Sequence, residues 1–279
     1  MGASGDLAKK KTFPSLLDLY ADNLLPSDLM IWGYARSDLG DDGLRDRLRP
    51  YLQKAAKEGK KITQDHVNSF TGKIFYQQGK SYGDIDAFEN LASKIEEHEK
   101  KNPSVCHNRL FYFAIPPNVF AETGEAVKLT AMATRGWTRV IVEKPFGRDL
   151  KSYEKLSKSL SQNFEEKHLY RIDHYLGKEM VQNLLVLRFG NLWFERLWNR
   201  DNIQSVTLTF KEPFGTEGRG GYFDKYGIIR DIQQNHLLQV FCLMAMEAPL
   251  KVSLTSIINT YLPKLLFISI CIHLCTACW

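Results

Sequence analysis

The chain has 279 residues, of which 44% are hydrophobic and 25% are charged, the composition of an ordinary globular protein with a sizeable core. This composition excludes wholesale disorder, and the length is enough for one or two domains. The formal net charge is +5, and the basic residues are dispersed. A mild, dispersed positive charge favours a small anionic ligand. It argues against nucleic acid, which calls for a basic stripe with interleaved aromatic residues.

The cysteines and the first residues indicate the compartment. Five cysteines, at positions 106, 242, 271, 275 and 278, are an odd and unevenly placed set, unlike a secreted disulfide framework. Neither a charged segment followed by an apolar run nor an Arg- and Ser-rich leader opens the sequence. We therefore expect a cytoplasmic protein with no membrane partner, although a targeting peptide lost with an N-terminal segment would escape this reading.

The chain begins with a candidate phosphate-binding turn, formed by Gly2, Ala3, Ser4, Gly5, Asp6 and Leu7. The pattern predicts a tight turn that leads into a helix over Lys9 to Tyr20, whose free backbone amides and dipole would hold a pyrophosphate. Such a turn normally follows a buried strand, but only Met1 precedes it, so we expect the first strand of the fold to be missing. A flexible glycine-containing terminus is the alternative, because one glycine pair is a weak motif.

Segments typical of strands and of helices then alternate. Apolar runs that suit buried strands cover residues 29–35, 110–115 and 138–143, and helical patterns cover residues 43–56, 85–101, 119–133 and 151–160. This alternation predicts parallel βαβ units and an α/β fold with a doubly wound sheet. Ligands of such sheets bind at the carboxyl ends of strands, where Arg36 and Lys144 lie.

The stretch from Arg171 to Glu179 concentrates groups that suit a site: Asp173, His174, Tyr175 and Lys178. An Asp can orient a His that acts as a base, and His, Tyr and Lys offer donors to a hydroxylated anionic ligand. A solvated polar loop is the alternative interpretation.

Three patterns follow this stretch. Residues 177–191 predict a helix, with Met180, Leu184, Leu185 and Leu187 in its core-facing side. Residues 203–210 alternate between polar and apolar, which predicts a strand with one covered face. Residues 226–247 predict a long helix that carries Asp231 and His236. Taken alone, a histidine on such an apolar helix is more often a satisfied core histidine than a catalytic one.

The C-terminal residues form an apolar tail. The run from Leu265 to Trp279 is shorter than the usual ~20 residues of a membrane-spanning helix, which leaves an interfacial tail as an alternative. Cys275 and Cys278 form one C-x-x-C pair without a second pair of ligands, so we predict no metal site.

Four motifs in order carry a resemblance to a known family: MGASGDLAKKK from Met1, IVEKPFG from Ile141, RIDHYLGKE from Arg171, and KEPFGTEGRGGYF from Lys211, which continues into DIQQNHLLQ. With their spacing, they resemble glucose-6-phosphate dehydrogenase from Met1 to about Ala248. The resemblance implies a Rossmann-like NADP-binding domain over residues 1–172 and, over residues 173–248, the start of a truncated α+β substrate domain with a mostly antiparallel sheet. Residues 249–279 then form a tail foreign to the family.

The resemblance also implies roles for individual residues. His236 matches the general base, and Asp173 matches the carboxylate that orients it. Lys144, His174, Tyr175, Lys178, Glu212 and Asp231 match residues that bind glucose 6-phosphate. The residues that match the NADP site are Gly2, Ala3, Ser4, Gly5, Asp6, Leu7, Arg36 and Lys144.

The implied activity is NADP-dependent oxidation of glucose 6-phosphate at C1 to 6-phospho-D-glucono-1,5-lactone, the first step of the oxidative pentose phosphate pathway, by a protein that forms homo-oligomers at full length. One alternative is an inactive remnant that binds coenzyme or sugar phosphate, or that pairs with a full-length subunit. A membrane-associated isoform held by the apolar tail is the other.

Overall fold

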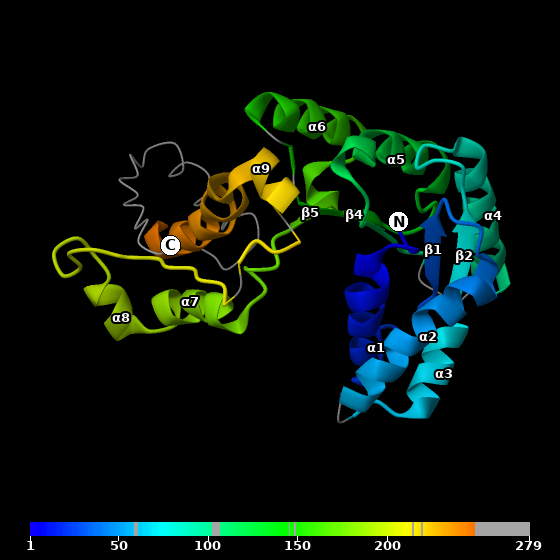
Figure 1. Cartoon of the computed structure of the whole chain (residues 1–279), viewed down its shortest axis with the longest axis horizontal. Coiled ribbons are helices and arrows are strands. Elements are labelled where there is room, and N and C mark those ends of the chain that lie inside the picture. Colours follow the sequence, from blue (N-terminus) through cyan, green and yellow to red (C-terminus); the bar gives the residue numbers. More distant parts are fainter. Residues whose placement is uncertain are drawn as a thin grey trace. The chain divides into compact units, whose positions relative to one another are not determined.

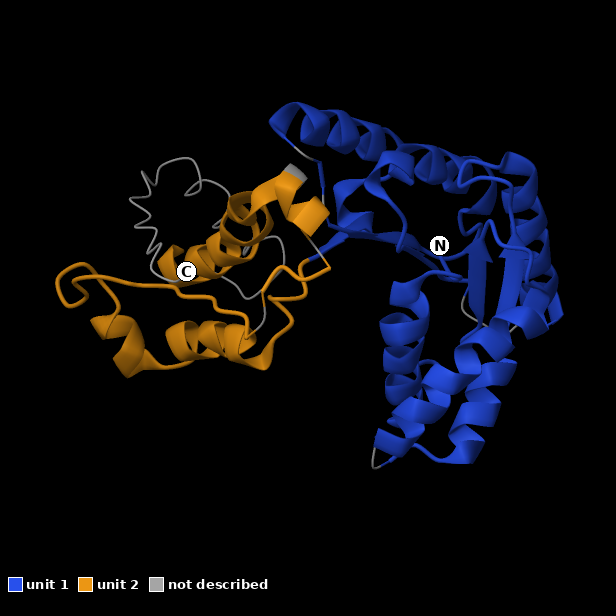
Figure 2. Cartoon of the chain, viewed as in Figure 1, with its two compact units in different colours: residues 1–172 blue, residues 173–279 orange. Residues whose placement is uncertain are grey.

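A computed structural model describes residues 1–58, 61–101, 107–144, 146–147, 149–213, 215–218 and 220–248. The chain divides into two compact units, residues 1–172 and residues 173–279, coloured separately in Figure 2. Two expectations fall outside the described residues: the tail over residues 249–279, and a cis bond before Pro145, which the sequence alone leaves undecided.

Among the described residues of the first unit, every pair of neighbouring strands is parallel. β1 (Ile31–Ala35) pairs with β2 (Ile74–Gln78), and Ile31 lies opposite Ile74. A second sheet has the order β3-β4-β5, built from β3 (Arg109–Phe113), β4 (Thr138–Glu143) and β5 (Leu169–Ile172). Figure 1 shows these strands among the helices that connect them. The predicted parallel α/β architecture is confirmed, although the hydrogen-bonded ladders form two sheets where one was expected.

The helical elements of this unit alternate with the strands. They are η1 (Ala8–Thr12), α1 (Phe13–Ala21), α2 (Gly40–Glu58), α3 (Gln64–Gly72), α4 (Ile85–Lys101), η2 (Pro117–Val119), α5 (Phe120–Ala126), η3 (Val127–Ala131), α6 (Leu150–Asn163) and η4 (Glu166–His168). The predicted helices are confirmed with shifted ends, and α4 has the predicted bounds. Neither α3, β2 nor β5 was predicted from the sequence.

Two apolar clusters fill the first unit. One cluster contains residues of η1, α1, α2 and α3 and of the sheet of β1 and β2. In α2, Leu44, Leu48 and Leu52 are fully buried in this cluster. Their spacing of four residues places them on one helix face. Burial of each side chain contributes about 1.5–3 kcal/mol. The other cluster packs Phe88 of α4 and Phe120 of α5 against Phe113 of β3.

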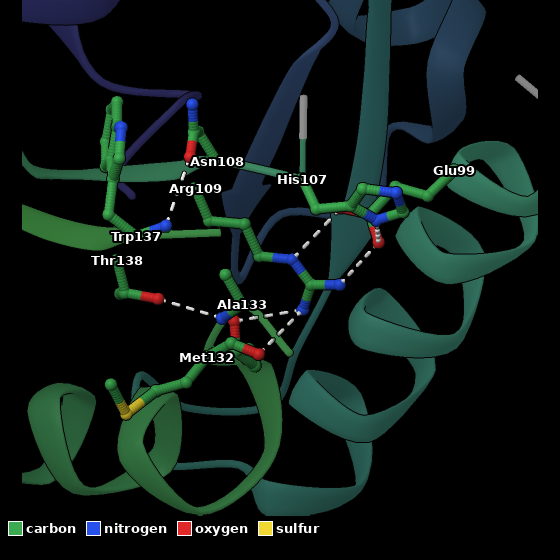
Figure 3. Close-up of polar contacts among 9 residues, drawn as sticks. Glu99, His107, Asn108, Arg109, Met132, Ala133, Trp137 and Thr138 are labelled. Atoms are coloured by element: carbon green, nitrogen blue, oxygen red, sulfur yellow. Dashed lines mark hydrogen bonds and ion pairs between the residues drawn. The ribbon is translucent and has the colours of Figure 1, made fainter. Parts of the chain in front are cut away.

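A buried ion pair ties together the ends of three elements in the first unit (Figure 3). Arg109 Nη2 lies 2.9 Å from Glu99 Oε2, and Arg109 Nη1 donates to the carbonyls of Ala131 and Met132 at 3.1 and 3.2 Å. His107 Nδ1 lies 3.3 Å from the same Glu99 oxygen. Burial alone would raise the pKa of Glu99, but Arg109 and His107 together outweigh it and lower that pKa.

All regular elements in the described part of the second unit are helical. Its elements are α7 (Glu179–Phe189), α8 (Leu192–Leu197), α9 (Gly220–Ile228), η5 (Ile229–Leu237) and α10 (Leu238–Ala245). The long helix predicted over residues 226–247 is therefore divided: Gly227 interrupts α9 with φ 73°, and η5 is a π-helix. Arg188 closes the end of α10, because its Nη1 and Nη2 donate to the carbonyls of Leu243 and Met246 at 2.6 and 2.7 Å.

Two predictions for this unit are wrong: the strand over residues 203–210, and the core positions of Met180 and Leu187. Residues 203–210 form no strand, and no antiparallel sheet occurs among the described residues. An alternating pattern favours extended backbone, but a strand also needs a neighbour to accept its hydrogen bonds. Met180 and Leu187, expected in the core, are exposed, whereas Val181 and Arg188 are the buried residues of α7.

Candidate active site

An imidazole and a carboxylate meet in the second unit. His236 Nδ1 lies 2.6 Å from Asp173 Oδ1, and only 2% and 7% of their side-chain surfaces are exposed. An ionised carboxylate can only accept a hydrogen bond, so Nδ1 of His236 carries the proton that points at Asp173. Nε2 is then the basic nitrogen, and the negative charge of Asp173 stabilises the imidazolium that forms when Nε2 takes up a second proton.

The turn that follows β5 fixes Asp173. The backbone N–H of Tyr175 donates to Asp173 Oδ1 at 3.0 Å, and the backbone N–H of Leu176 donates to the Asp173 carbonyl at 3.1 Å. This is an Asx-type turn, in which the side chain of an Asp bonds the backbone two residues on. The same carboxylate oxygen therefore holds the turn and the imidazole, so the orientation of His236 depends on the local conformation of the loop.

Tyr175 and its neighbours cover the imidazole. The Tyr175 ring stacks on His236 with centroids 3.8 Å apart, and the His174 ring meets His236 edge-on at 5.2 Å. The Tyr175 hydroxyl donates to Glu212 Oε1 at 3.3 Å. Burial, followed by the charge of Glu212 and this hydrogen bond, raises the pKa of Tyr175 to about 12, so the phenol stays a donor at neutral pH. Lys178 Nζ lies 4.1 Å from the centroid of the same ring.

Asp231 and His236 come from one element, since both are buried residues of η5. The Asp231 carboxylate accepts a hydrogen bond from the Tyr222 hydroxyl at 2.8 Å. The structure thus gathers six sequence-predicted residues within the second unit: Asp173, His174, Tyr175, Glu212 and His236 through direct contacts, with Lys178 against the Tyr175 ring. Asp231 shares their unit and the helix that carries His236.

Two aromatic residues of this region were not predicted. Phe210 meets the Tyr175 ring edge-on with centroids 4.9 Å apart, and Tyr222 is the donor to Asp231. Tyr222 lies inside the KEPFGTEGRGGYF motif, so a tyrosine hydroxyl within that motif could have marked it as a site residue. Nothing in the sequence distinguishes Phe210 from an ordinary strand residue.

Asp173, His174 and His236 also form a group that could hold a metal ion. Each offers one potential ligand atom, and the three atoms lie within 4.8 Å of one another. Carboxylate and imidazole are ligands of several divalent metals. Two of the three side chains are already hydrogen-bonded to each other, and metal binding would have to break that bond.

The predicted phosphate-binding turn lies in the first unit and leads into a helix. Gly2 has φ +79°, and a Cβ on it would come within 2.2 Å of the Ala114 carbonyl oxygen, so this position requires glycine. The Gly5 N–H donates to the Gly2 carbonyl at 3.0 Å, and the helix begins directly after Gly5. Asp6, at the helix start, pairs with Lys9 and Lys10, which lower its pKa to about 2. Ser4 Oγ lies 3.1 Å from Ser37 Oγ.

Arg36 and Lys144 directly follow strands of the first unit, as predicted. Arg36 follows β1, is exposed, and has its guanidinium 5.7 Å from the centroid of the Tyr82 ring. Lys144 follows β4 and is half-buried. These two residues and the turn belong to residues 1–172, whereas the candidate base and its neighbours belong to residues 173–279.

The chain matches two family models. One, described as glucose-6-phosphate dehydrogenase, NAD binding domain, matches residues 1–183, and the other, the C-terminal domain of the same enzyme, matches residues 185–268. The second match extends past Ala248, into the segment that the sequence analysis assigns to a foreign tail.

Several known proteins are similar to the chain. It is 54% identical over 255 residues to the cytoplasmic isoform of glucose-6-phosphate 1-dehydrogenase from Solanum tuberosum, covering 89% of this chain and 49% of that protein. It is 53% identical over 250 residues to glucose-6-phosphate 1-dehydrogenase of Saccharomyces cerevisiae, covering 89% and 48%. The chain thus spans about half the length of the curated relatives it matches.

Solved structures are similar too. A glucose-6-phosphate dehydrogenase in complex with its substrate glucose 6-phosphate superposes with a TM-score of 0.86 at 47% identity, covering 93% of this chain and 53% of that one. The enzyme from Mycobacterium avium superposes with a TM-score of 0.80 at 35% identity, with the same coverage. Sequence and structure therefore agree that the chain belongs to the glucose-6-phosphate dehydrogenase family.

Proposed function

We propose that the chain carries the NADP-dependent oxidation of glucose 6-phosphate at C1 to 6-phospho-D-glucono-1,5-lactone. The observation that supports this most directly is the 2.6 Å contact between His236 and Asp173, in a member of this family. Oxidation of a hydroxyl to a carbonyl needs a base for the O–H proton while hydride leaves the same carbon. His236 Nε2 is that base in our proposal, and Asp173 is its positioning residue.

The surrounding groups suit a phosphorylated sugar. His174, Tyr175 and Lys178 offer an imidazole, a hydroxyl and an ammonium to the phosphate, while Glu212 and Asp231 offer carboxylates that accept hydrogen bonds from sugar hydroxyls. Lys144 is a further donor in our proposal, to substrate and coenzyme. His236 is only 1% exposed, and the Tyr175 ring stacks on the face of its imidazole.

Residues 1–172 form the coenzyme domain in our proposal, and residues 173–248 contribute the substrate site. The turn from Gly2 to Leu7 suits a pyrophosphate because it leads into the start of a helix, where free backbone amides can donate to an anion. The guanidinium of Arg36, placed after β1 where an acid would favour NAD, suits the 2′-phosphate of NADP. When bound, NADP supplies the hydride acceptor.

We also propose a cytoplasmic location, on the strength of relatives named as cytoplasmic isoforms. In the described part of the chain, no helix is long and apolar enough to cross a membrane.

Turnover by the purified chain tests the activity. With NADP and glucose 6-phosphate, the absorbance of the reduced nicotinamide should rise, and His236→Asn should abolish that rise while leaving the affinity for glucose 6-phosphate, measured by calorimetry, unchanged. His168→Asn, which alters a histidine of the first unit, is the matched control and should turn over normally. Normal turnover by the His236 variant would remove this residue as the base. A folded wild-type chain that binds the sugar phosphate without turnover would instead be a binding protein.

A further inference from the structure

The ammonium group of Lys178 lies against two aromatic rings. Lys178 Nζ is 4.1 Å from the centroid of the Tyr175 ring and 5.6 Å from the centroid of the Phe210 ring. A cation within about 6 Å of a ring centroid is attracted to the face of that ring. The two rings also meet each other edge-on, with centroids 4.9 Å apart. The ammonium and the two rings therefore form one group in the second unit.

The chain fixes the backbone of Lys178 but leaves its side chain exposed. The Lys178 N–H donates to the Tyr175 carbonyl at 3.2 Å, and the Lys178 carbonyl accepts from Val181 and Gln182 at the start of α7. A lysine side chain is long and flexible, and it loses rotamer entropy when it is held in one place. Among the described residues, no carboxylate forms an ion pair with Lys178, so the two rings are the groups that hold its ammonium.

Phe210 contributes only a ring to this group. Its side chain has no polar atom, so it offers no hydrogen bond to a ligand. It is half-buried, in the part of the chain that connects α8 to α9. Glu212, two residues further on, accepts a hydrogen bond from the Tyr175 hydroxyl at 3.3 Å. This hydrogen bond keeps the connection beside Tyr175 and brings the Phe210 ring to the ammonium of Lys178.

An ammonium that lies on aromatic rings can still bind an anion. It has three N–H donors and no acceptor, and the donors that point away from the rings stay available. The rings fix the position of the ammonium before a ligand arrives, so less rotamer entropy is lost when an anion binds. Removal of the Phe210 ring should therefore weaken the binding of an anion without removing a group that touches it.

We propose that Phe210 is a positioning residue for phosphate recognition, whose ring holds the Lys178 ammonium against Tyr175 for the phosphate of glucose 6-phosphate. This role rests on the proposed function, in which Lys178 and Tyr175 bind that phosphate. Phe210 touches neither substrate nor coenzyme in this role, and it acts through Lys178. It therefore affects the affinity for phosphate compounds and leaves the proton transfer to His236 unchanged.

Phe210→Leu, which keeps an apolar side chain but has no ring, tests this role. We expect the Kd for inorganic phosphate, measured by calorimetry, and the KM for glucose 6-phosphate to rise about three- to fivefold, with kcat unchanged. Phe210→Tyr keeps a ring and should behave as the wild type. Phe194→Leu is the matched control, because Phe194 is a half-buried aromatic residue of the same unit that stacks on Trp198, and it should change neither value. An unchanged phosphate affinity in Phe210→Leu, or an equal loss in Phe210→Tyr, would overturn the role.

A double variant tests whether Phe210 acts through Lys178. Lys178→Met removes the ammonium, so adding Phe210→Leu to that variant should not weaken the binding of glucose 6-phosphate any further. A further loss of about three- to fivefold, as large as in the single Phe210 variant, would show that the ring acts independently of the ammonium and would overturn the proposal.

Nuclear magnetic resonance of the ligand-free chain tests the contact itself. Protons above the face of an aromatic ring resonate upfield, so the ε-methylene protons of Lys178 should lie upfield of those of the other lysines. Phe210→Leu should reduce this shift, and an ordinary lysine position in the wild type would contradict the proposal. A wild type that shows the shift but binds neither inorganic phosphate nor glucose 6-phosphate would remove the proposed phosphate site, and the role of Phe210 with it. A wild type that binds both, with Phe210→Leu binding them equally well, would remove only the role of Phe210.

Discussion

His236 Nδ1 lies 2.6 Å from Asp173 Oδ1, although 63 positions separate the two residues in the sequence. This contact predicts the effect of Asp173→Asn. An amide in place of the carboxylate can donate to Nδ1, which moves the imidazole proton to Nε2 and removes the base. We expect kcat to fall roughly 100- to 10,000-fold with little change in KM. Asp224→Asn, at an exposed acid of α9, should leave kcat unchanged. Wild-type turnover by the Asp173 variant would show that the pair does not orient a base.

The buried ion pair of Glu99 and Arg109 should contribute far more to stability than the exposed pair of Glu97 and Lys101 on α4. Glu99→Gln leaves a buried guanidinium without its counter-charge, and we expect a loss of about 3 kcal/mol in the free energy of unfolding. Glu97→Gln removes an exposed contact with Lys101, which water and salt screen, and should leave the free energy of unfolding almost unchanged. Urea unfolding followed by circular dichroism measures both. Equal losses would mean that burial of the pair has no energetic consequence.

The same pair predicts a pH dependence. The pKa of Glu99 is lower in the folded chain than its ordinary value of about 4.3, so the folded state favours the ionised form. Its contribution to stability is complete above that ordinary value and is lost as the pH falls through the lowered pKa of the folded state. The stability gap between the wild type and Glu99→Gln should therefore narrow only below about pH 4.3. Urea midpoints measured through this range test it, and a gap that already narrows near neutral pH would contradict it.

Comparing Gly2 with Gly40 distinguishes two costs of an added Cβ, backbone strain at positive φ and a steric clash with neighbouring atoms. Both have positive φ, but a Cβ at Gly40 meets nothing within 4 Å, whereas one at Gly2 meets the Ala114 carbonyl oxygen at 2.2 Å. Gly40→Ala should cost about 1 kcal/mol from the backbone conformation alone. Gly2→Ala adds a clash with the backbone, so we expect at least about 2 kcal/mol. It should also weaken binding of NADP, measured by calorimetry. Similar unfolding midpoints for the two variants would argue against the close approach at Gly2.

Arg188 should be a determinant of the stability of the second unit. Its guanidinium donates to two carbonyls at the end of α10, and burial lowers its pKa. Arg188→Met leaves these carbonyls without their donor, and we expect a loss of about 3 kcal/mol. Arg230→Met, at an exposed arginine of η5, should change stability by less than about 0.5 kcal/mol. Thermal unfolding of the two variants gives the comparison, and matching melting temperatures would contradict the role of Arg188.

The sequence predicts the elements of the first unit where a single apolar pattern specifies them. β4 occupies the predicted residues Thr138–Glu143, because its alternating burial follows from β-branched residues at every second position. α3 escaped prediction because its apolar face is weak, and its capping box uses His66 at the position where Glu or Gln is the recognisable signal. β5 escaped because it has only four residues, of which one is buried, and because it takes its conformation from pairing with β4.

The candidate site was predicted from the resemblance rather than from local pattern. Nothing in the periodicity of η5 indicates that His236 meets a carboxylate from a loop, because the contact depends on tertiary packing. The same limit explains Phe210, whose ring contacts Tyr175 although its own pattern predicts a strand.

The break at Gly227 lies inside α9, just before its end at Ile228. The hydrogen bond from Tyr222 to Asp231 joins the part of α9 that precedes the break to η5, which follows it. A molecule that engages the Asp231 carboxylate competes with this hydrogen bond. Binding of such a molecule would then loosen the part of α9 that precedes the break. Faster cleavage of α9 by a protease would therefore detect ligand binding without an assay of enzyme activity.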